Sequence, residues 1–249
     1  MTSTLEQEVR GIAEAAKVAS AQLAQKTADE RNAALRAMAE ALRANANTIV
    51  AANEQDMAAA REAGTKDSLL DRLMLDDSRV EAMADALEDL VTLPNPLGRV
   101  QESRTLESGI RLERVSVSLG VVAVVYEARP NVTADAAGIC LKSGNACVLR
   151  GGSLAAKSCL AIAHVLHDAA VAAGMPHGCI GIIESTDRAA ADVLMSLHGI
   201  VDVLVRAEAP GSFTIACNVR RFPLLKRERA IATYMCTKRP ASPWRATLC

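Results

Sequence analysis

The chain has 249 residues, of which 50% are apolar and 23% are charged, and its formal net charge is −1. These values suit one large or two small globular domains and exclude a wholly disordered chain. The longest apolar run after residue 118, Val121–Tyr126, is too short to cross a bilayer, and the N-terminus lacks a basic-then-apolar leader. We therefore expect a cytoplasmic protein with no membrane partner.

Residues 1–93 are predicted to form an antiparallel helical unit. Apolar residues recur at steps of three and four over 5–23, which is the spacing of one buried helix face. Gly64 and the cluster from Pro94 to Gly98 are expected to end the helices before them. Two pairs have capping-box spacing ahead of further helices: Thr27 with Glu30, and Ser78 with Glu81.

Residues 94–205 are predicted to form an α/β domain of the nucleotide-binding type. The alternation of apolar residues over 110–117 indicates a hairpin or edge ribbon, and the β-branched run Val121–Val125 is typical of a central parallel strand. Helical and strand-like segments then alternate, which predicts a doubly wound, Rossmann-like parallel sheet with right-handed crossovers. We expect helices at 132–143, 154–172 and 187–197, and strands at 146–150, 179–183 and 201–205.

The composition changes abruptly near Val205. Residues 1–205 hold 19 basic and 27 acidic side chains, whereas residues 206–249 hold 9 basic and 2 acidic ones. Four of the five aromatic residues also lie after Val205. We predict that residues 206–249 are an aberrant basic tail that is poorly ordered and unrelated to the fold.

Two loops follow strands at the predicted carboxyl edge of the sheet, where doubly wound folds bind ligands. The first, residues 127–133, carries Arg129 and Asn131, and the second is Arg150-Gly151-Gly152-Ser153. Glycines allow backbone amides to approach an anion, a helix N-terminus adds positive potential, and a guanidinium binds bidentately. The second loop therefore suits a phosphate, although an ordinary turn with a surface arginine has the same pattern.

The remaining chemical side chains favour structural roles. His164 and His167 are three residues apart on a predicted helix, but without further ligands at suitable spacing we expect no metal site. The seven cysteines show no C-x-x-C spacing, which argues against a disulfide framework and a four-cysteine zinc site. Four cysteines lie among apolar neighbours and are predicted to be inert buried thiols: Cys140, Cys147, Cys159 and Cys179.

Two segments closely resemble the γ-glutamyl phosphate reductases, a family of the aldehyde dehydrogenase superfamily also called glutamate-5-semialdehyde dehydrogenases. They are G-V-V-A-V-V-Y-E-A-R-P-N-V-T (120–133) and L-K-S-G-N-A-C-V-L-R-G-G (141–152). The resemblance covers about residues 5–205 and includes L-D-R-L at 70–73 and D-V-L-V at 202–205. It implies an aldehyde-dehydrogenase-like fold and NADPH-dependent reduction of L-glutamate 5-phosphate to L-glutamate 5-semialdehyde in proline biosynthesis.

The resemblance also implies roles for particular residues. Asn131 matches the asparagine that helps to hold the oxyanion at the substrate carbonyl. Arg150, followed by Gly151, Gly152 and Ser153, matches the basic residue that meets the adenosine ribose of the cofactor or its phosphate. The implied mechanism is attack of a cysteine thiolate on the acyl phosphate, loss of phosphate, and hydride transfer from NADPH to the thioester.

The chain departs from the family after Val205. Family members continue with P-R-G-G-A-G-L-I and later place the nucleophilic cysteine in an R-P-S-x-C-N context, and neither motif is present here. Codons for residues 219–233 can be chosen so that the adjacent frame encodes the family sequence A-T-V-P-V-I-E-T-G-T-G-N-C-H. We therefore hypothesise a single-base deletion directly after Val205. The product would be a truncated enzyme that lacks the nucleophile, binds NADPH poorly and does not turn over.

Two other functions compete with this interpretation. The chain could instead act as a non-catalytic nucleotide-binding or subunit-interaction fragment, and the formation of a homo-oligomer stays open. The basic tail could also be a nucleic-acid arm, since clustered cations release counterions from phosphates. Its basic residues form no helical stripe, however, and the reading-frame hypothesis already explains their number. We therefore expect no nucleic-acid partner.

Overall fold

The computed structural model describes residues 4–207 and 213–217. Their centre is a five-stranded sheet with the order β5-β4-β3-β6-β7. The first four of these strands are parallel, and β7 pairs antiparallel with β6. The strands are β3 (Val121–Tyr126), β4 (Ala146–Arg150), β5 (Ile180–Ile182), β6 (Val203–Ala207) and β7 (Phe213–Cys217). As the continuous apolar run predicts, β3 lies in the middle and is buried along nearly its whole length.

The path of the chain through the sheet confirms the doubly wound prediction. From β3 the chain passes through α6 (Asn131–Lys142) to β4 and through α7 (Ala156–Ala172) to β5. It then returns through α8 (Arg188–Ser196) to β6, on the other side of β3. The strand order therefore reverses between β3 and β6, which makes a topological switch point at their carboxyl ends.

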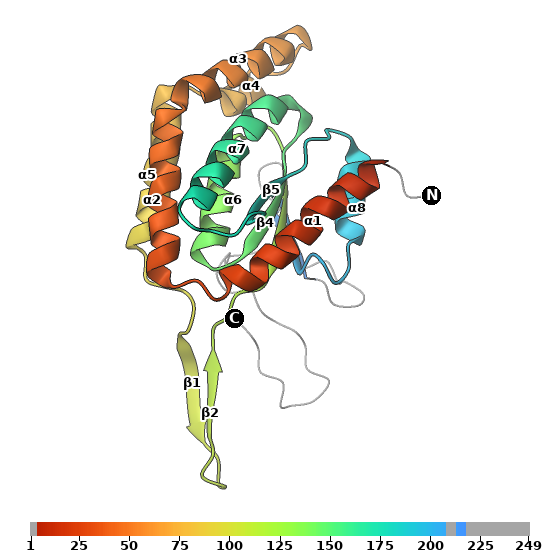
Figure 1. Ribbon diagram of the computed structural model, residues 1–249. Coiled ribbons are helices and arrows are strands. Elements are labelled where there is room, and N and C mark those ends of the chain that lie inside the picture. Colours follow the sequence, from red (N-terminus) through yellow and green to blue (C-terminus); the bar gives the residue numbers. More distant parts are fainter. Residues whose placement is uncertain (1–3, 208–212, 218–249) are drawn as a thin grey trace.

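Helices cover both faces of the sheet, and a further helical layer lies outside one of them (Figure 1). One face is covered by α6 and α7, and the other by α8 and α1 (Thr4–Leu23), which contacts the strands directly. The outer layer on α6 and α7 consists of α2 (Ala28–Ala44), α3 (Ala46–Glu62) and α5 (Asp77–Thr92), and the short α4 (Asp67–Leu73) packs on α3. All of these helices and the sheet share one hydrophobic core. The predicted division into a helical unit (1–93) and an α/β domain (94–205) therefore stays a prediction.

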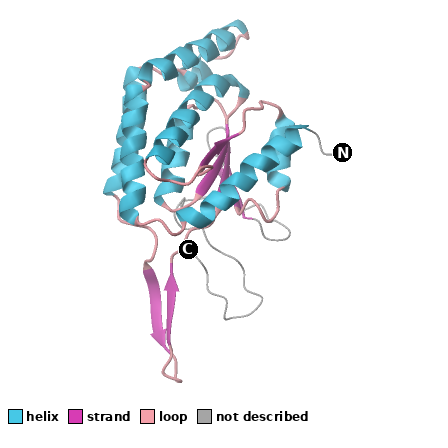
Figure 2. Cartoon of the chain, viewed as in Figure 1, coloured by secondary structure: helices cyan, strands magenta, loops and turns pink. Residues whose placement is uncertain are grey.

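A two-stranded ribbon projects from this body (Figures 1 and 2). It pairs β1 (Val100–Thr105) with β2 (Arg111–Val115) in antiparallel register, which confirms the predicted hairpin. Every residue of β1 is exposed to solvent. The ribbon therefore has no core of its own on either face.

The two predicted capping boxes have different outcomes. At the start of α2, Thr27 Oγ1 accepts the Glu30 amide and Glu30 Oε2 accepts the Thr27 amide, so this box is confirmed. The Ser78 box is wrong, because α5 begins at Asp77 and its cap is Asp76. The Asp76 carboxylate accepts the Arg79 amide at 2.8 Å. An ionised carboxylate at a helix N-terminus is a stronger acceptor than a hydroxyl, which explains this choice.

The predicted tail is described only in part. The expected boundary at Val205 lies inside β6, which continues to Ala207, and β7 also belongs to the predicted tail. Residues 208–212 and 218–249 lie outside the described residues.

One described helical segment, residues 153–172, is long and apolar enough to cross a membrane when judged by length and composition alone. It contains α7, which lies between the sheet and the outer helices α2 and α3. Ile162 and Leu166 of this helix are fully buried in the shared core. In this fold the segment is therefore a core helix.

Candidate functional site

The loop after β3 is held rigidly where the chain leaves the sheet. The Arg129 amide donates to the Glu127 carbonyl at 2.6 Å, and the Thr133 amide donates to the Pro130 carbonyl at 3.0 Å. Behind the loop, the buried hydroxyls of Tyr126 and Thr133 are 2.7 Å apart and share a hydrogen bond. This turn leaves Arg129 and Asn131 exposed at the carboxyl edge of the sheet.

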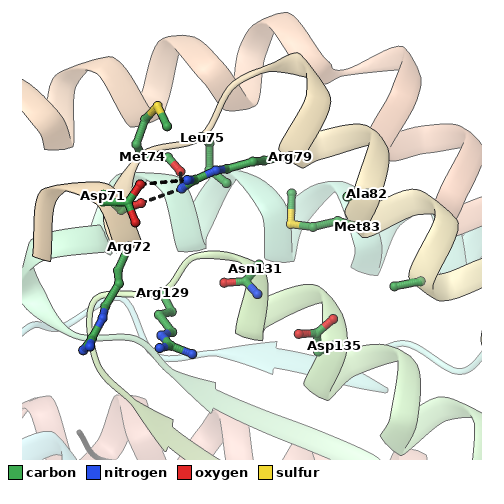
Figure 3. A pocket seen from close by; sticks show the side chains of 11 residues that line it. Asp71, Arg72, Met74, Leu75, Arg79, Ala82, Met83, Arg129, Asn131 and Asp135 are labelled. Atoms are coloured by element: carbon green, nitrogen blue, oxygen red, sulfur yellow. Dashed lines mark hydrogen bonds and ion pairs between the residues drawn. The ribbon is translucent and has the colours of Figure 1, made fainter. Parts of the chain in front are cut away.

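Asn131 lines a cleft of about 450 Å³ between the first turns of α6 and the helices α4 and α5 (Figure 3). The apolar part of its wall consists of Met74, Leu75, Ala82, Met83 and Ala86. The polar part consists of Asp71, Arg72, Arg79, Arg129, Asn131 and Asp135. The cleft therefore combines an apolar wall with an amide donor and three guanidinium groups.

Arg79 fixes one wall of the cleft. Its guanidinium donates to the carbonyl oxygens of Asp71 and Met74 at the C-terminal end of α4, and it forms an ion pair with the Asp71 carboxylate at 3.0 Å. A cation at a helix C-terminus satisfies carbonyls that have no partner within the helix. The family-like segment L-D-R-L thus gives Asp71 to this pair, while Leu73 enters the core and Arg72 lines the cleft.

Asp135 lies one turn after Asn131 on the same face of α6 and also lines the cleft. Burial raises the pKa of its carboxyl group above the usual value. Arg79 forms its ion pair with Asp71. Neither Arg72 nor Arg129 forms an ion pair with any described residue. The cleft therefore has an excess of positive charge.

The structure places Arg150 differently from both sequence-based alternatives. The residue as a whole is only 9% exposed, so it is not a surface arginine. The guanidinium donates to the carbonyls of Thr186 at 2.8 Å and Asp187 at 3.2 Å, and its buried Nε has no partner in the described part of the chain. Arg150 thus holds the loop before α8 in place and does not present its guanidinium to an anion in this conformation.

The two glycines after Arg150 serve close packing. A Cβ at Gly151 would lie 2.9 Å from Cys159 Sγ, and one at Gly152 would lie 3.1 Å from Glu127 Cα. Ser153 opens a short 3₁₀ turn, Ser153–Ala155, and is exposed. The glycines are therefore needed because β4, its loop and α7 approach one another closely.

The N-terminus of α7 is already occupied by a carboxylate of the protein itself. Asp56 of α3 accepts the amides of Lys157 at 3.3 Å and Ser158 at 2.8 Å, and also the Ser158 hydroxyl at 2.6 Å. In this structure Asp56 therefore takes the place that an anion would have at this helix end, and the interpretation of R-G-G-S as a phosphate loop stays a prediction. Asp56 precedes Ser158 by 102 residues, so no local pattern could reveal it.

The recess beside Gly151 is too small for a dinucleotide in this conformation. It has a volume of about 10 Å³ and is lined by α7 and by Ile183, Glu184 and Thr186 after β5. A space of this size holds about one water molecule. Asn131 does not line this recess, so the structure does not bring the two sequence-predicted loops into one cavity.

The four cysteines predicted to be inert are all buried, as expected. A hydrogen bond with Cys140, together with burial, raises the pKa of Cys147 well above its usual value, and burial raises the pKa of Cys159 and Cys179 to about 11. A thiol must be ionised to act as a nucleophile, and these three are neutral at physiological pH. Within residues 4–207 and 213–217, no group of three or more His, Cys, Asp and Glu side chains is placed to hold a metal ion.

Comparisons with known proteins agree with this architecture. A model of the aldehyde dehydrogenase family matches residues 1–205. The chain is 45% identical over 198 residues to the gamma-glutamyl phosphate reductase of Caldanaerobacter subterraneus, covering 80% of this chain and 48% of that protein. It is 46% identical over 226 residues to the Moorella thermoacetica protein of the same name, covering 91% and 54%.

Solved structures give the same picture. The gamma-glutamyl phosphate reductase of Thermotoga maritima superposes with a TM-score of 0.79 at 36% identity, over 82% of this chain and 49% of that one. An acetylating aldehyde dehydrogenase from Geobacillus thermoglucosidasius, at 24% identity and a TM-score of 0.65, shares the fold over 83% of this chain and 43% of its own. The chain spans about half the length of the curated relatives it matches. It belongs to the aldehyde dehydrogenase family.

Proposed function

We propose that this chain forms the part of an NADPH-dependent reductase that positions L-glutamate 5-phosphate, and that the 249-residue polypeptide alone does not turn over. The complete reaction would convert the acyl phosphate, NADPH and a proton into L-glutamate 5-semialdehyde, phosphate and NADP⁺. The observation that carries this proposal is the placement of Asn131, on the first turn of α6, in a positively charged cleft at the carboxyl edge of the sheet. The names of the relatives supply the substrate class.

Asn131 is proposed to donate its side-chain amide to the carbonyl oxygen of the substrate. A donor fixed at the start of a helix can stabilise the negative charge that develops on this oxygen when a nucleophile attacks the carbonyl carbon. The backbone hydrogen bonds of the turn over residues 127–133 support this role, because they fix the position of the Asn131 backbone at the start of α6.

The proposed lack of turnover is supported by the burial of four cysteine thiols. Cys147, Cys159 and Cys179 are buried and remain protonated at neutral pH, and Cys140 is buried as well. None of these four could attack an acyl phosphate dissolved in the cleft. The nucleophilic cysteine of the family would have to come from a part of the family sequence that residues 1–205 do not match.

Binding of NADPH is proposed to be impaired. The small recess beside Gly151 and the engagement of Arg150 with the loop before α8 both support this. By resemblance, Arg150, Gly151, Gly152 and Ser153 remain the proposed contacts of the adenosine end. Among the described residues, the recess beside Gly151 would have to widen before these four residues could hold the cofactor.

The activity proposal is tested by following NADPH oxidation with L-glutamate 5-phosphate generated in situ by an ATP-dependent kinase. The full-length Moorella relative serves as the positive control. We expect no turnover from the purified chain and weak binding in a fluorescence titration with NADPH. Turnover comparable to that of the control would refute the proposal, and tight NADPH binding would refute the impaired cofactor site.

A second candidate function is that of a subunit-interaction fragment, and the projecting ribbon favours it. Ile110 and Leu112 are 62% and 44% exposed, so the ribbon presents apolar side chains that its own chain does not cover. We propose that a second copy, or a full-length subunit, covers it. Light scattering during gel filtration should show an oligomer that an Ile110→Ser/Leu112→Ser variant weakens. A monomer at all concentrations, with no co-purification of a full-length relative, would exclude this function.

We also retain the proposal that a single-base deletion changed the reading frame after Val205. The family match ends at residue 205, which supports it, although the 226-residue alignment with the Moorella protein extends past that position. Resequencing the gene across codons 203–210 tests it directly. Recovery of the family motif P-R-G-G-A-G after insertion of one base is expected. An intact frame with no downstream P-S-x-C-N coding would exclude the deletion.

A further inference from the structure

Two arginines of the cleft form no ion pair with any described residue, and they come from different elements of the fold. Arg72 belongs to the last turn of α4, and Arg129 belongs to the loop between β3 and α6. Figure 3 shows both guanidinium groups extended toward the same side of the cleft, below Asn131. Within the described residues neither forms an ion pair, whereas Arg79 beside them is bound to Asp71.

The absence of an ion-pair partner among the described residues is informative for Arg72 and Arg129 because both line the same cleft. Arg10 of α1 also forms no ion pair among the described residues, but it is exposed and lines no cleft, so water can solvate its charge. Arg72 and Arg129 instead line one concave space, and each is held by a structured backbone. Two like charges that share a cleft repel each other unless an anion lies between them. The arrangement therefore favours a ligand with negative charge.

The geometry of guanidinium groups narrows the class of anion. Each planar fork can donate two parallel hydrogen bonds to a pair of oxygens, and two forks can together engage a phosphate dianion. A carboxylate has only two oxygens and one charge, so it cannot use both forks equally well. In addition, Arg129 precedes Asn131 by only two residues. A phosphate at the arginines would thus be adjacent to a carbonyl group at Asn131, as in an acyl phosphate.

We propose that Arg72 and Arg129 form the subsite that binds the phosphate group of the acyl phosphate substrate. This assignment rests on the proposed function for the identity of the substrate, while the recognition of phosphate rests on the cleft itself. The pair would orient the carbonyl carbon and stabilise the phosphate as a leaving group. Inorganic phosphate shares this chemistry and is the probe for the subsite alone.

The test uses the purified 249-residue chain and isothermal titration at low ionic strength with inorganic phosphate, acetyl phosphate and L-glutamate. We expect saturable binding of both phosphates and none of L-glutamate at the same concentrations. Arg72→Gln and Arg129→Gln should each weaken phosphate binding about tenfold or more, as loss of a charged hydrogen-bonding pair does. Arg72→Lys should retain part of the affinity. Arg10→Gln, on the outer surface of α1, removes the same charge and should change the affinity less than twofold.

Thermal unfolding of each variant shows whether its fold is intact; among the described residues neither Arg72 nor Arg129 forms an ion pair that the substitution would break. Lack of saturable phosphate binding by the wild-type chain would overturn the assignment, and so would equal effects of Arg10→Gln and the cleft variants. Binding of inorganic phosphate without acetyl phosphate, or of L-glutamate in preference to both, would overturn the acyl phosphate as ligand. Since none of these readouts needs NADPH or turnover, failure of the proposed function would leave them unchanged.

Discussion

Removing the Asp56 side chain should destabilise the chain by unfastening α7 from α3. In Asp56→Ala the amide and hydroxyl of Ser158, which is fully buried, lose their acceptor, and the N-terminus of α7 loses its only described carboxylate. A buried donor left without a partner costs about 1–3 kcal/mol, and loss of a helix cap costs about 0.5–2 kcal/mol. We expect a total of about 3 kcal/mol, because these contributions overlap.

Urea unfolding followed by circular dichroism measures this loss. For a chain of this length a change of about 3 kcal/mol corresponds to a fall in Tm of roughly 6–12 °C. Asp56→Asn, which keeps one acceptor oxygen, should lose about half as much. Glu54→Ala removes an exposed carboxylate from the same helix and should stay within about 0.5 kcal/mol of the wild type. If Asp56→Ala and Glu54→Ala have equal effects, the carboxylate does not hold α7.

Three further outcomes follow from the packing of the sheet. Gly120→Ala should lower the free energy of unfolding in urea by at least about 2 kcal/mol. Gly120 has a φ of +115°, and a Cβ at this position would lie 2.2 Å from Asp202 Oδ2. A variant as stable as the wild type would show that Asp202 does not pack tightly against Gly120. Burial raises the pKa of Cys159 and Cys179 from 9.0 to about 11, so the stability that their neutral thiols contribute is complete below pH 9 and is lost as the pH rises to about 11. The Tm should therefore fall over this interval more steeply than in a Cys159→Ala/Cys179→Ala variant, and parallel curves would contradict the assignment. Both thiols should also react with an aromatic disulfide reagent at pH 8 only after denaturation, so rapid labelling of the native chain would show that they are accessible.

One wall of the candidate site could be located from the sequence, but the opposite wall and the contacts within the site could not. The apolar run ending at Tyr126 and the turn-forming Pro130 placed Asn131 at the carboxyl edge of the sheet, where the structure also has it. The opposite wall of the cleft was missed, because Arg72 precedes Arg129 by 57 residues and carries no motif that points to α6. For Arg150 the sequence predicted the end of a strand correctly but not the direction of its guanidinium, which depends on carbonyls contributed by the loop before α8.

The sequence by itself determined the elements whose signals are local. A helix period, a β-branched run and the Thr27–Glu30 box each involve residues within about one or two turns, so their free energies are set by neighbours in the chain. The tertiary structure alone decided which carboxylate occupies the N-terminus of α7 and which arginines form no ion pair among the described residues. Those outcomes depend on competition among side chains that are distant in sequence and meet only when the helices pack on the sheet. Asp56 accepts hydrogen bonds from α7 and Asp71 forms an ion pair with Arg79, whereas Arg72 and Arg129 face the same cleft.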